Sequence, residues 1–175
     1  MRFKTAALAL VTTAIISTSA VSEELKQYSS DSYVQNQYEI IKLKFDDLDV
    51  SREGTAIKII IPTDYGFETG KSTLKRSMKD TLREFAHFLN TYPETTIQVV
   101  GFTDSRGDFN YNKQLGLTRA KAVEAVLLEA KVTPFRMKTY SEGEELPRCT
   151  NQTQKGQECN RRVEMTVAVE SNLEF

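Results

Sequence analysis

An acid and a basic residue fifteen positions apart are the strongest candidates for binding a charged ligand. Asp104 follows an apolar run at residues 96–102 that predicts a β-strand, and Arg119 ends a loop-like segment rich in Gly, Asn and Asp. Ligands commonly bind at the carboxyl ends of strands in α/β sheets. We expect Arg119 in the first turn of a helix, where the helix dipole disfavours a cation. That placement indicates an arginine held for an incoming anion.

A carboxylate and a guanidinium at one site complement a zwitterion. Asp104 would accept hydrogen bonds from an ammonium group, and Arg119 would bind a carboxylate through two parallel hydrogen bonds. Amino-acid termini carry both of these groups on one carbon. The spacing fits a direct Asp104–Arg119 ion pair equally well, so both interpretations stand at this point.

The residues needed for catalysis are scarce. The chain has a single histidine, His87, expected on the surface of a helix. One histidine cannot supply a Ser/His/Asp triad, a Cys/His pair or a zinc set. Asp104 and Asp108 share a loop and could mimic a carboxylate pair, but no other residue pattern supports acid–base chemistry. We therefore expect no enzyme, no metal site and no cofactor.

The start of the chain and its two cysteines indicate export. Residues 1–22 combine a basic start, a short apolar run and small residues, which is typical of a secretory signal peptide. The apolar run is shorter than the ~20 residues of a spanning helix, so a retained anchor is the minor alternative. In an exported chain, Cys149 and Cys159 are expected to form a disulfide. Without residues 1–22 the chain has 21 basic and 24 acidic residues, a formal net charge of −3. This charge offers no broad attraction for nucleic acid.

The hydrophobic pattern predicts an α/β (α+β) two-layer sandwich. Strands are expected near 47–51 and at 56–61, 96–102, 136–140 and 162–169, and helices at 31–45, 71–91 and 117–131. This βαβαβ order places the helices on one face of a small mixed sheet. The expected organisation is a signal peptide at 1–22, an N-terminal helix or linker at 23–45, a domain at 46–170 and a tail at 171–175.

Several motifs in order between residues 47 and 169 resemble the OmpA-like peptidoglycan-binding domain family. The matching positions are Gly101, Thr103 and Asp104; Asn112, Leu115, Arg119 and Ala120; Gly143, Glu144 and Pro147; Asn151 and Gly156; and Asn160, Arg161, Arg162, Val163 and Glu164. The resemblance implies a periplasmic domain that binds the meso-diaminopimelate of the cell-wall stem peptide. By position, Asp104 would hold the ammonium of this residue and Arg119 its carboxylate.

The resemblance also implies a wider ligand-binding set: Thr103 and Asn112 as polar contacts, Phe102 as a ring lining the pocket, and Arg162 beside the site. For the Asn160–Arg162 run, bracing of loops and contact with the ligand are equally open. Phe102 stands where the family usually has His, Gly116 where it has Ser at the expected helix cap, and Gln157 where Arg is common. These departures affect the expected affinity and leave Asp104 and Arg119 in place.

Two functions from different classes fit these features. The first is noncatalytic binding of peptidoglycan that tethers an envelope component to the cell wall of a Gram-negative bacterium, in the periplasm and with an outer-membrane association left open. The second is a periplasmic adaptor that docks a secretion, motor or envelope complex through residues 23–45, with wall binding secondary. A wall hydrolase is disfavoured because the chain has no recognisable metal set or nucleophile.

Overall fold

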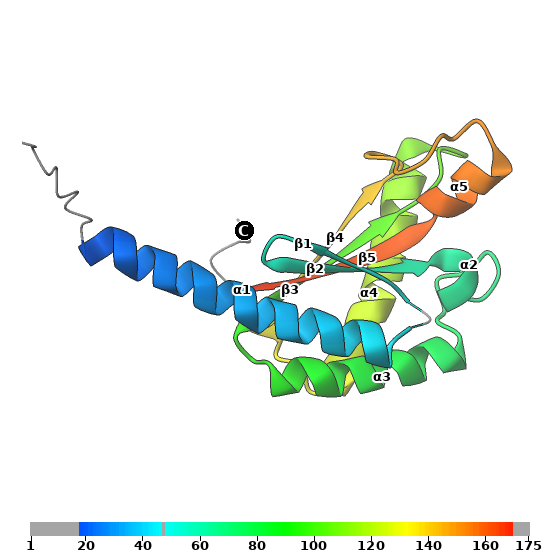
Figure 1. Cartoon of the computed structure of the whole chain (residues 1–175). Helices are drawn as coiled ribbons and strands as arrows, with labels where there is room; N and C mark the ends of the chain where they lie inside the picture. The colour runs from blue at the N-terminus through cyan, green and yellow to red at the C-terminus, as the bar shows by residue number, and fades with distance from the viewer. Residues whose placement is uncertain (1–17, 47, 170–175) are drawn as a thin grey trace, which may run out of the picture.

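The computed structural model describes residues 18–46 and 48–169 and contains one five-stranded mixed sheet. The strands are β1 (Asp49–Glu53), β2 (Ala56–Pro62), β3 (Thr95–Phe102), β4 (Met137–Gly143) and β5 (Arg162–Val169). Their order in the sheet is β1-β2-β5-β3-β4, with β3 and β4 parallel and the other pairs antiparallel. The predicted two-layer α/β architecture is confirmed (Figure 1).

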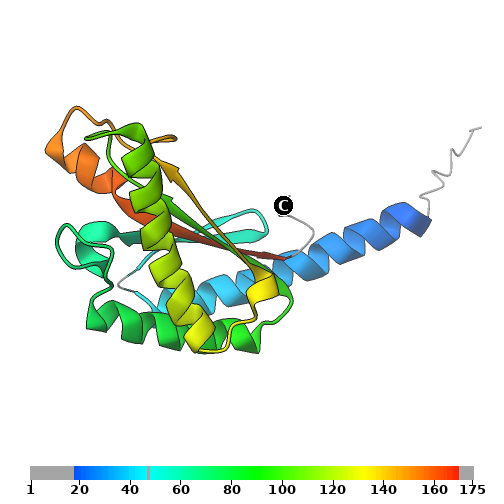
Figure 2. The same ribbon diagram turned by 180° about the vertical axis from the view of Figure 1, so that it is seen from behind.

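Three long helices pack on one face of this sheet. They are α1 (Thr18–Lys44), α3 (Arg76–Thr91) and α4 (Phe109–Glu129), and Figure 2 shows α4 crossing in front of the strands. The shorter elements are α2 (Thr63–Gly66), the 3-10 turn η1 (Pro134–Arg136) and α5 (Gln154–Asn160). The signal-peptide prediction falls mostly on residues 1–17 and the predicted tail on 171–175, which lie outside the described residues.

Strand alternation sorts the side chains of the sheet between a face that packs on the helices and the opposite face. Ile57, Ile59 and Ile61 of β2 lie in the same buried cluster as Val163 and Met165 of β5. Because side chains alternate along a strand, the intervening residues point to the opposite face. The core therefore lies between the sheet and the three long helices.

Helix α1 joins this core through its second half. Val34, Ile41 and Phe45 are buried in the shared cluster, and the Phe45 ring packs edge-on against Phe85 of α3 with centroids 5.4 Å apart. The first half of α1 projects away from the sheet (Figure 1). The helix expected at 31–45 is therefore present and begins earlier, at Thr18.

The predicted start of α3 was wrong by five residues. Leu74, which fits the apolar stripe of this helix, precedes it and forms an isolated bridge with Phe67. The backbone of this loop closes on itself, with the amide of Glu68 donating to Thr73 O at 2.9 Å and that of Lys75 to Gly66 O at 3.0 Å. Leu74 is buried within this loop. Its side chain is therefore apolar because it is packed in the core, although it does not belong to the helix.

The predicted start of α4 was wrong by eight residues. The helix begins at Phe109, and the Asp108 carboxylate caps it by accepting from the amides of Asn110 (2.9 Å) and Tyr111 (3.0 Å). The carboxylate-pair alternative for Asp108 therefore gives way to an N-cap. The first turns of α4 are polar because they border a pocket, so the hydrophobic pattern could not reveal them.

Gly116 is an interior residue of α4 and not the cap that the sequence suggested. A Cβ atom built on Gly101 of β3 would lie 1.9 Å from Gly116 O, and one on Gly116 would lie 2.3 Å from Ser141 Oγ. The two glycines let the backbones of α4 and β3 approach closely. This contact sets the position of α4 relative to the end of β3, where Asp104 lies.

Candidate functional site

Asp104 lies just beyond the end of β3 and is held by two arginines. The preceding Thr103 amide donates to Gly143 O at 2.7 Å, which fixes the backbone. Asp104 is 5% exposed, and its Oδ2 accepts from Arg106 Nη2 (2.9 Å), Arg106 Nε (3.2 Å) and Arg161 Nη1 (2.9 Å). Burial raises the pKa of Asp104, but the hydrogen bonds from Arg106 and Arg161 outweigh it and lower the pKa overall. The carboxylate is therefore ionised at neutral pH.

Arg161 connects Asp104 to a second acid. Its Nη2 donates to Asp64 Oδ2 at 2.6 Å, while Nη1 holds Asp104. Burial lowers the pKa of Arg161, but the bonds to Asp64 and Asp104 raise it overall. The backbone joins the same elements, because the Thr63 amide of α2 donates to Arg161 O at 2.8 Å. This bridge ties α2 and the start of β5 to the Asp104 loop.

Arg119 is buried in the middle of α4 without a carboxylate partner. It is 4% exposed, and its Nε donates to Lys71 O at 3.3 Å. Among the described residues, its two terminal nitrogens make no hydrogen bond and no ion pair. Burial and the nearby Arg161 charge both lower the pKa of Arg119. An anion bound here would relieve both effects, since burial and a like charge each disfavour the cationic form.

The two predicted partners line one pocket without pairing with each other. The ion pairs of Asp104 within residues 18–46 and 48–169 go to Arg106 and Arg161, so the direct Asp104–Arg119 pair does not form. The pocket has a volume of about 740 Å³ and is lined by residues that include Asp64, Asp104, Arg106, Tyr111, Arg119 and Arg161. Opposite charges thus face the same space.

Two hydroxyl groups in the pocket wall have no hydrogen-bond partner in the described part of the chain. Thr63 Oγ1 and Thr103 Oγ1 are both buried and unpaired, and both residues line the pocket. Buried polar atoms in folded proteins nearly always have a partner. The pocket therefore offers unused hydrogen-bonding capacity beside Asp104.

Asn112 lines the pocket and braces its loop. Its Nδ2 lies 2.6 Å from Glu144 Oε2, 3.1 Å from Arg106 O and 3.3 Å from Asp104 O. An amide nitrogen carries two hydrogens, so these three contacts already use its donors. The position of Asn112 therefore matches the prediction, while its contacts are those of a structural brace.

Phe102 and Arg162 lie outside the pocket, on the face of the sheet opposite the helices, and both are buried. They are register neighbours on β3 and β5, and the Arg162 guanidinium stacks 3.9 Å from the Phe102 ring centroid. Both line a separate cavity of about 400 Å³. The structure thus separates them from the pocket of Asp104 and Arg119, because side chains alternate along a strand and it is Gly101 and Val163 that face the helices.

Arg119 also differs from its predicted setting. It lies ten residues after the first residue of α4, so neither the free amides nor the dipole of the helix start acts on it. The sequence placed Arg119 at the start of a helix, and the structure places it in the middle of one. Desolvation and a like charge, and not the helix dipole, make this arginine receptive to an anion.

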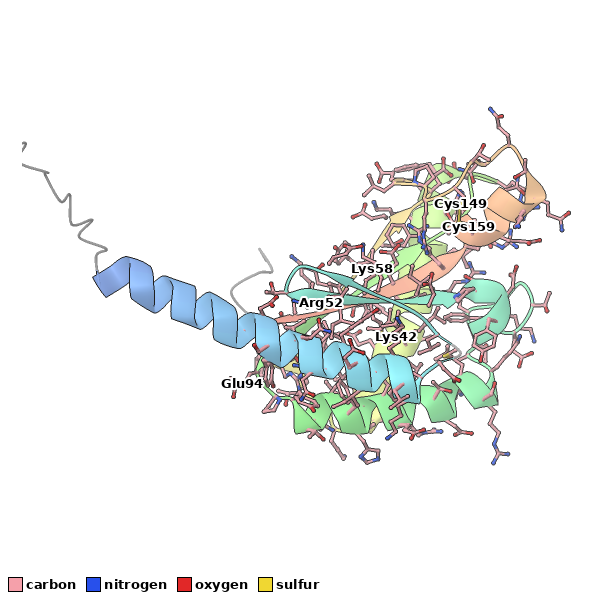
Figure 3. All side chains as sticks on the ribbon, in the orientation of Figure 1. Lys42, Arg52, Lys58, Glu94, Cys149 and Cys159 are labelled. Carbon is pink, nitrogen blue, oxygen red and sulfur yellow. A yellow bond between two sulfur atoms is a disulfide. The ribbon has the colours of Figure 1, made fainter. Side chains whose placement is uncertain are left out.

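The predicted disulfide is present between Cys149 and Cys159, beside α5 (Figure 3). The loop it closes contains Asn151, whose Oδ1 accepts from the Ser105 amide at 3.3 Å and from Asn160 Nδ2 at 2.9 Å. The disulfide-closed loop thus supports the residue next to Asp104. Asn160 hydrogen-bonds to Asn151 and Cys149 and so braces this loop. Arg161 links Asp104 to Asp64 and also lines the pocket.

Sequence reasoning missed Asp64 and Arg106 as members of the site. Arg106 is two residues from Asp104, in the segment already singled out, and its charge was the available signal. Asp64 is 97 residues from Arg161 in the chain, so only the fold brings them together. His87 is exposed on α3, as expected.

Two sets of features are absent from the described part of the chain. No group of three or more His, Cys, Asp or Glu residues there could hold a metal ion. No helix within residues 18–46 and 48–169 is long and apolar enough to span a membrane.

The mixed sheet with helices on one face, together with the charged pocket at the carboxyl end of β3, defines an α/β domain of the OmpA-like class. The chain belongs to the OmpA family, whose model matches residues 66–161.

Relatives and solved structures agree with this assignment. The chain is 34% identical over 127 residues to a probable lipoprotein, YiaD, of Escherichia coli K12, covering 73% of this chain and 58% of the relative. It is 38% identical over 81 residues to a peptidoglycan-associated lipoprotein of Agrobacterium fabrum, covering 46% of each chain. The chain thus spans about half the length of these relatives. A putative MotB-like protein from Desulfovibrio vulgaris shares the fold, with a TM-score of 0.73, 21% identity and coverage of 85% of this chain and 99% of that one.

Proposed function

We propose that this protein binds peptidoglycan noncovalently, through the side-chain end of meso-diaminopimelate, and tethers an envelope component to the cell wall. The observation that carries the proposal is the buried guanidinium of Arg119, whose terminal nitrogens have no partner among the described residues, in the same pocket as the ionised Asp104. The ligand end carries an ammonium and a carboxylate on one carbon. Each group has a residue of opposite charge in the pocket.

The roles follow from the contacts. Arg119 binds the ligand carboxylate through its terminal nitrogens, which are free of other partners. Asp104 accepts from the ammonium, and the unpaired hydroxyls of Thr63 and Thr103 add polar contacts. Tyr111 is 62% exposed at the pocket wall and covers the aliphatic part of the ligand. The relatives that carry peptidoglycan association in their names support this assignment.

No step of this function requires a bond to be made or broken. The Asp104 carboxylate is ion-paired with Arg106 and Arg161, and the described residues that line the pocket include no histidine or cysteine. The proposed role is therefore binding alone, in the periplasm and at the cell wall.

The shape of the molecule suits a tether. The pocket lies between α2, the loop after β3 and the first half of α4, whereas the N-terminal end of α1 points away at the other end of the molecule (Figures 1 and 2). A 27-residue helix is about 40 Å long. One end of the protein can thus contact the wall while the projecting first half of α1 faces an envelope partner.

The test is co-sedimentation of the purified protein with diaminopimelate-type peptidoglycan. Asp104→Ala and Arg119→Ala should each abolish sedimentation, because removing one partner of a desolvated charge contact costs about 2–5 kcal/mol, roughly 30-fold or more in Kd. A thermal melt of each variant separates loss of the site from loss of the fold.

The chain offers a matched control in its exposed Asp49–Arg148 ion pair, which is 3.1 Å long and lies away from the pocket. Asp49→Ala and Arg148→Ala should sediment like the wild type. Unchanged sedimentation of folded Asp104→Ala and Arg119→Ala proteins would contradict the site. A wild-type protein that fails to sediment would favour the adaptor function, with docking through residues 23–45.

A further inference from the structure

The side chain of Arg106 binds the Asp104 carboxylate, which is the group expected to accept the ammonium of the proposed ligand. Its Nε and Nη2 both donate to Asp104 Oδ2, at 3.2 and 2.9 Å, and every hydrogen bond and ion pair of this side chain within the described residues goes to Asp104. Arg106 lies in the pocket wall, and its side chain is 65% exposed. Arg106 is therefore an exposed cation paired with a buried anion.

Asp104 Oδ2 has no capacity left in this state. A carboxylate oxygen offers about two lone pairs. Three guanidinium N–H groups already point at Oδ2, two from Arg106 and one from Arg161. An ammonium group that binds Oδ2 must therefore displace one of the two arginines, whereas Oδ1 accepts one bond, from the Arg106 amide.

Arg161 is the less replaceable of the two. Its side chain is 18% exposed and is held at both ends, by Asp104 and by Asp64. If the Arg106 side chain leaves, Asp104 keeps the bond from Arg161 and a bond from the Arg106 backbone amide to Oδ1 at 3.1 Å. The carboxylate therefore stays ionised and oriented while its outer side opens to the pocket.

We propose that Arg106 is a tethered competitor, which fills the cation position of the free site and is displaced by the ammonium of the bound ligand. This inference rests on the proposed function and adds a regulation of the same site. Because Arg106 is attached two residues from Asp104, it competes at a high effective concentration. It lowers the affinity for any ligand and disfavours a cation that cannot also bind Arg119. A zwitterion anchored by its carboxylate is the class of ligand able to displace it.

The direct test is the Kd of free meso-diaminopimelate for the full chain, measured by calorimetry for the wild type, Arg106→Gln and Arg148→Gln. Removing an exposed competitor should tighten binding roughly two- to fivefold in Arg106→Gln, in line with the small energy of exposed ion pairs. Arg148→Gln removes the same charge from an exposed arginine away from the pocket and should match the wild type.

The possible results distinguish the competitor role of Arg106 from the proposed binding of diaminopimelate. Binding by the wild type that is unchanged or weakened in Arg106→Gln overturns the competitor role, and weakening would make Arg106 a ligand contact instead. No binding by either protein overturns the proposed function and the competitor role with it.

A second measurement tests the contact without any ligand. NMR titration of the Asp104 carboxyl carbon should show a higher pKa in Arg106→Gln than in the wild type, because two hydrogen bonds that lower it are lost. Arg148→Gln should leave the titration of Asp104 unchanged. An Asp104 pKa that does not respond to Arg106→Gln would mean that the arginine does not occupy the carboxylate, and the competitor role would fall.

Discussion

Asp104 and Arg119 are both buried, but their charges are compensated differently. Asp104 is surrounded by donors, whereas the terminal nitrogens of Arg119 face the pocket without a partner among the described residues. A buried charge without a partner is unfavourable unless a ligand or solvent compensates it. An anion in the pocket would therefore compensate Arg119, while Arg106 and Arg161 already compensate Asp104 through Oδ2.

The lowered pKa of Asp104 predicts a loss of stability in acid. A carboxylate whose folded pKa lies below its unfolded value of about 3.9 contributes stability above that value and loses it as the pH falls through the folded pKa. The free energy of unfolding, measured with urea at pH 7 and pH 3, should therefore fall for the wild type. Asp104→Asn should be less stable than the wild type at pH 7 and should lose less on acidification. Equal losses for both proteins would contradict the pairing of Asp104 with its arginines.

At the scale of elements, the end of β3 and the middle of α4 position the two key residues. Gly101 and Gly116 bring the backbones into contact, so that Arg119, one turn beyond Gly116, reaches the pocket that Asp104 borders. The predicted strands and the periodic parts of α3 and α4 are present because burial of one face dictates those residues. The polar start of α4 and the short helices α2 and α5 carry no such periodicity.

Gly101→Ala should destabilise the protein strongly, because the new Cβ atom would lie 1.9 Å from a backbone oxygen of α4. Overpacking of this kind typically costs about 1–3 kcal/mol or more in the free energy of unfolding. Gly54→Ala is the control, since its Cβ atom meets nothing within 4 Å and adds only the strain of a positive φ. Urea unfolding compares the two variants. A Gly101→Ala protein as stable as Gly54→Ala would show that the helix and strand are not in close contact.

Across the whole molecule, the site depends on contacts between distant parts of the chain. Arg161 lies 57 residues from Asp104 and 97 from Asp64, so local patterns could not reveal this network. Motif resemblance placed Asp104 and Arg119 in one pocket, but it could not tell which face of a strand each neighbour occupies. Phe102 and Arg162 are next to site residues in sequence and lie on the opposite side of the sheet.

The central claim is that the pocket recognises a zwitterion, with Arg119 binding its carboxylate and Asp104 its ammonium. The most direct measurement compares binding of the wild-type protein to two peptidoglycans, one with meso-diaminopimelate in the stem peptide and one with L-lysine in its place. Lysine keeps the side-chain ammonium and lacks the carboxylate, so Arg119 would have no partner. We predict sedimentation with the diaminopimelate type and at least tenfold weaker binding to the lysine type, given the energy of a desolvated charge pair. Equal binding to both would contradict recognition by Arg119 and with it the proposed site.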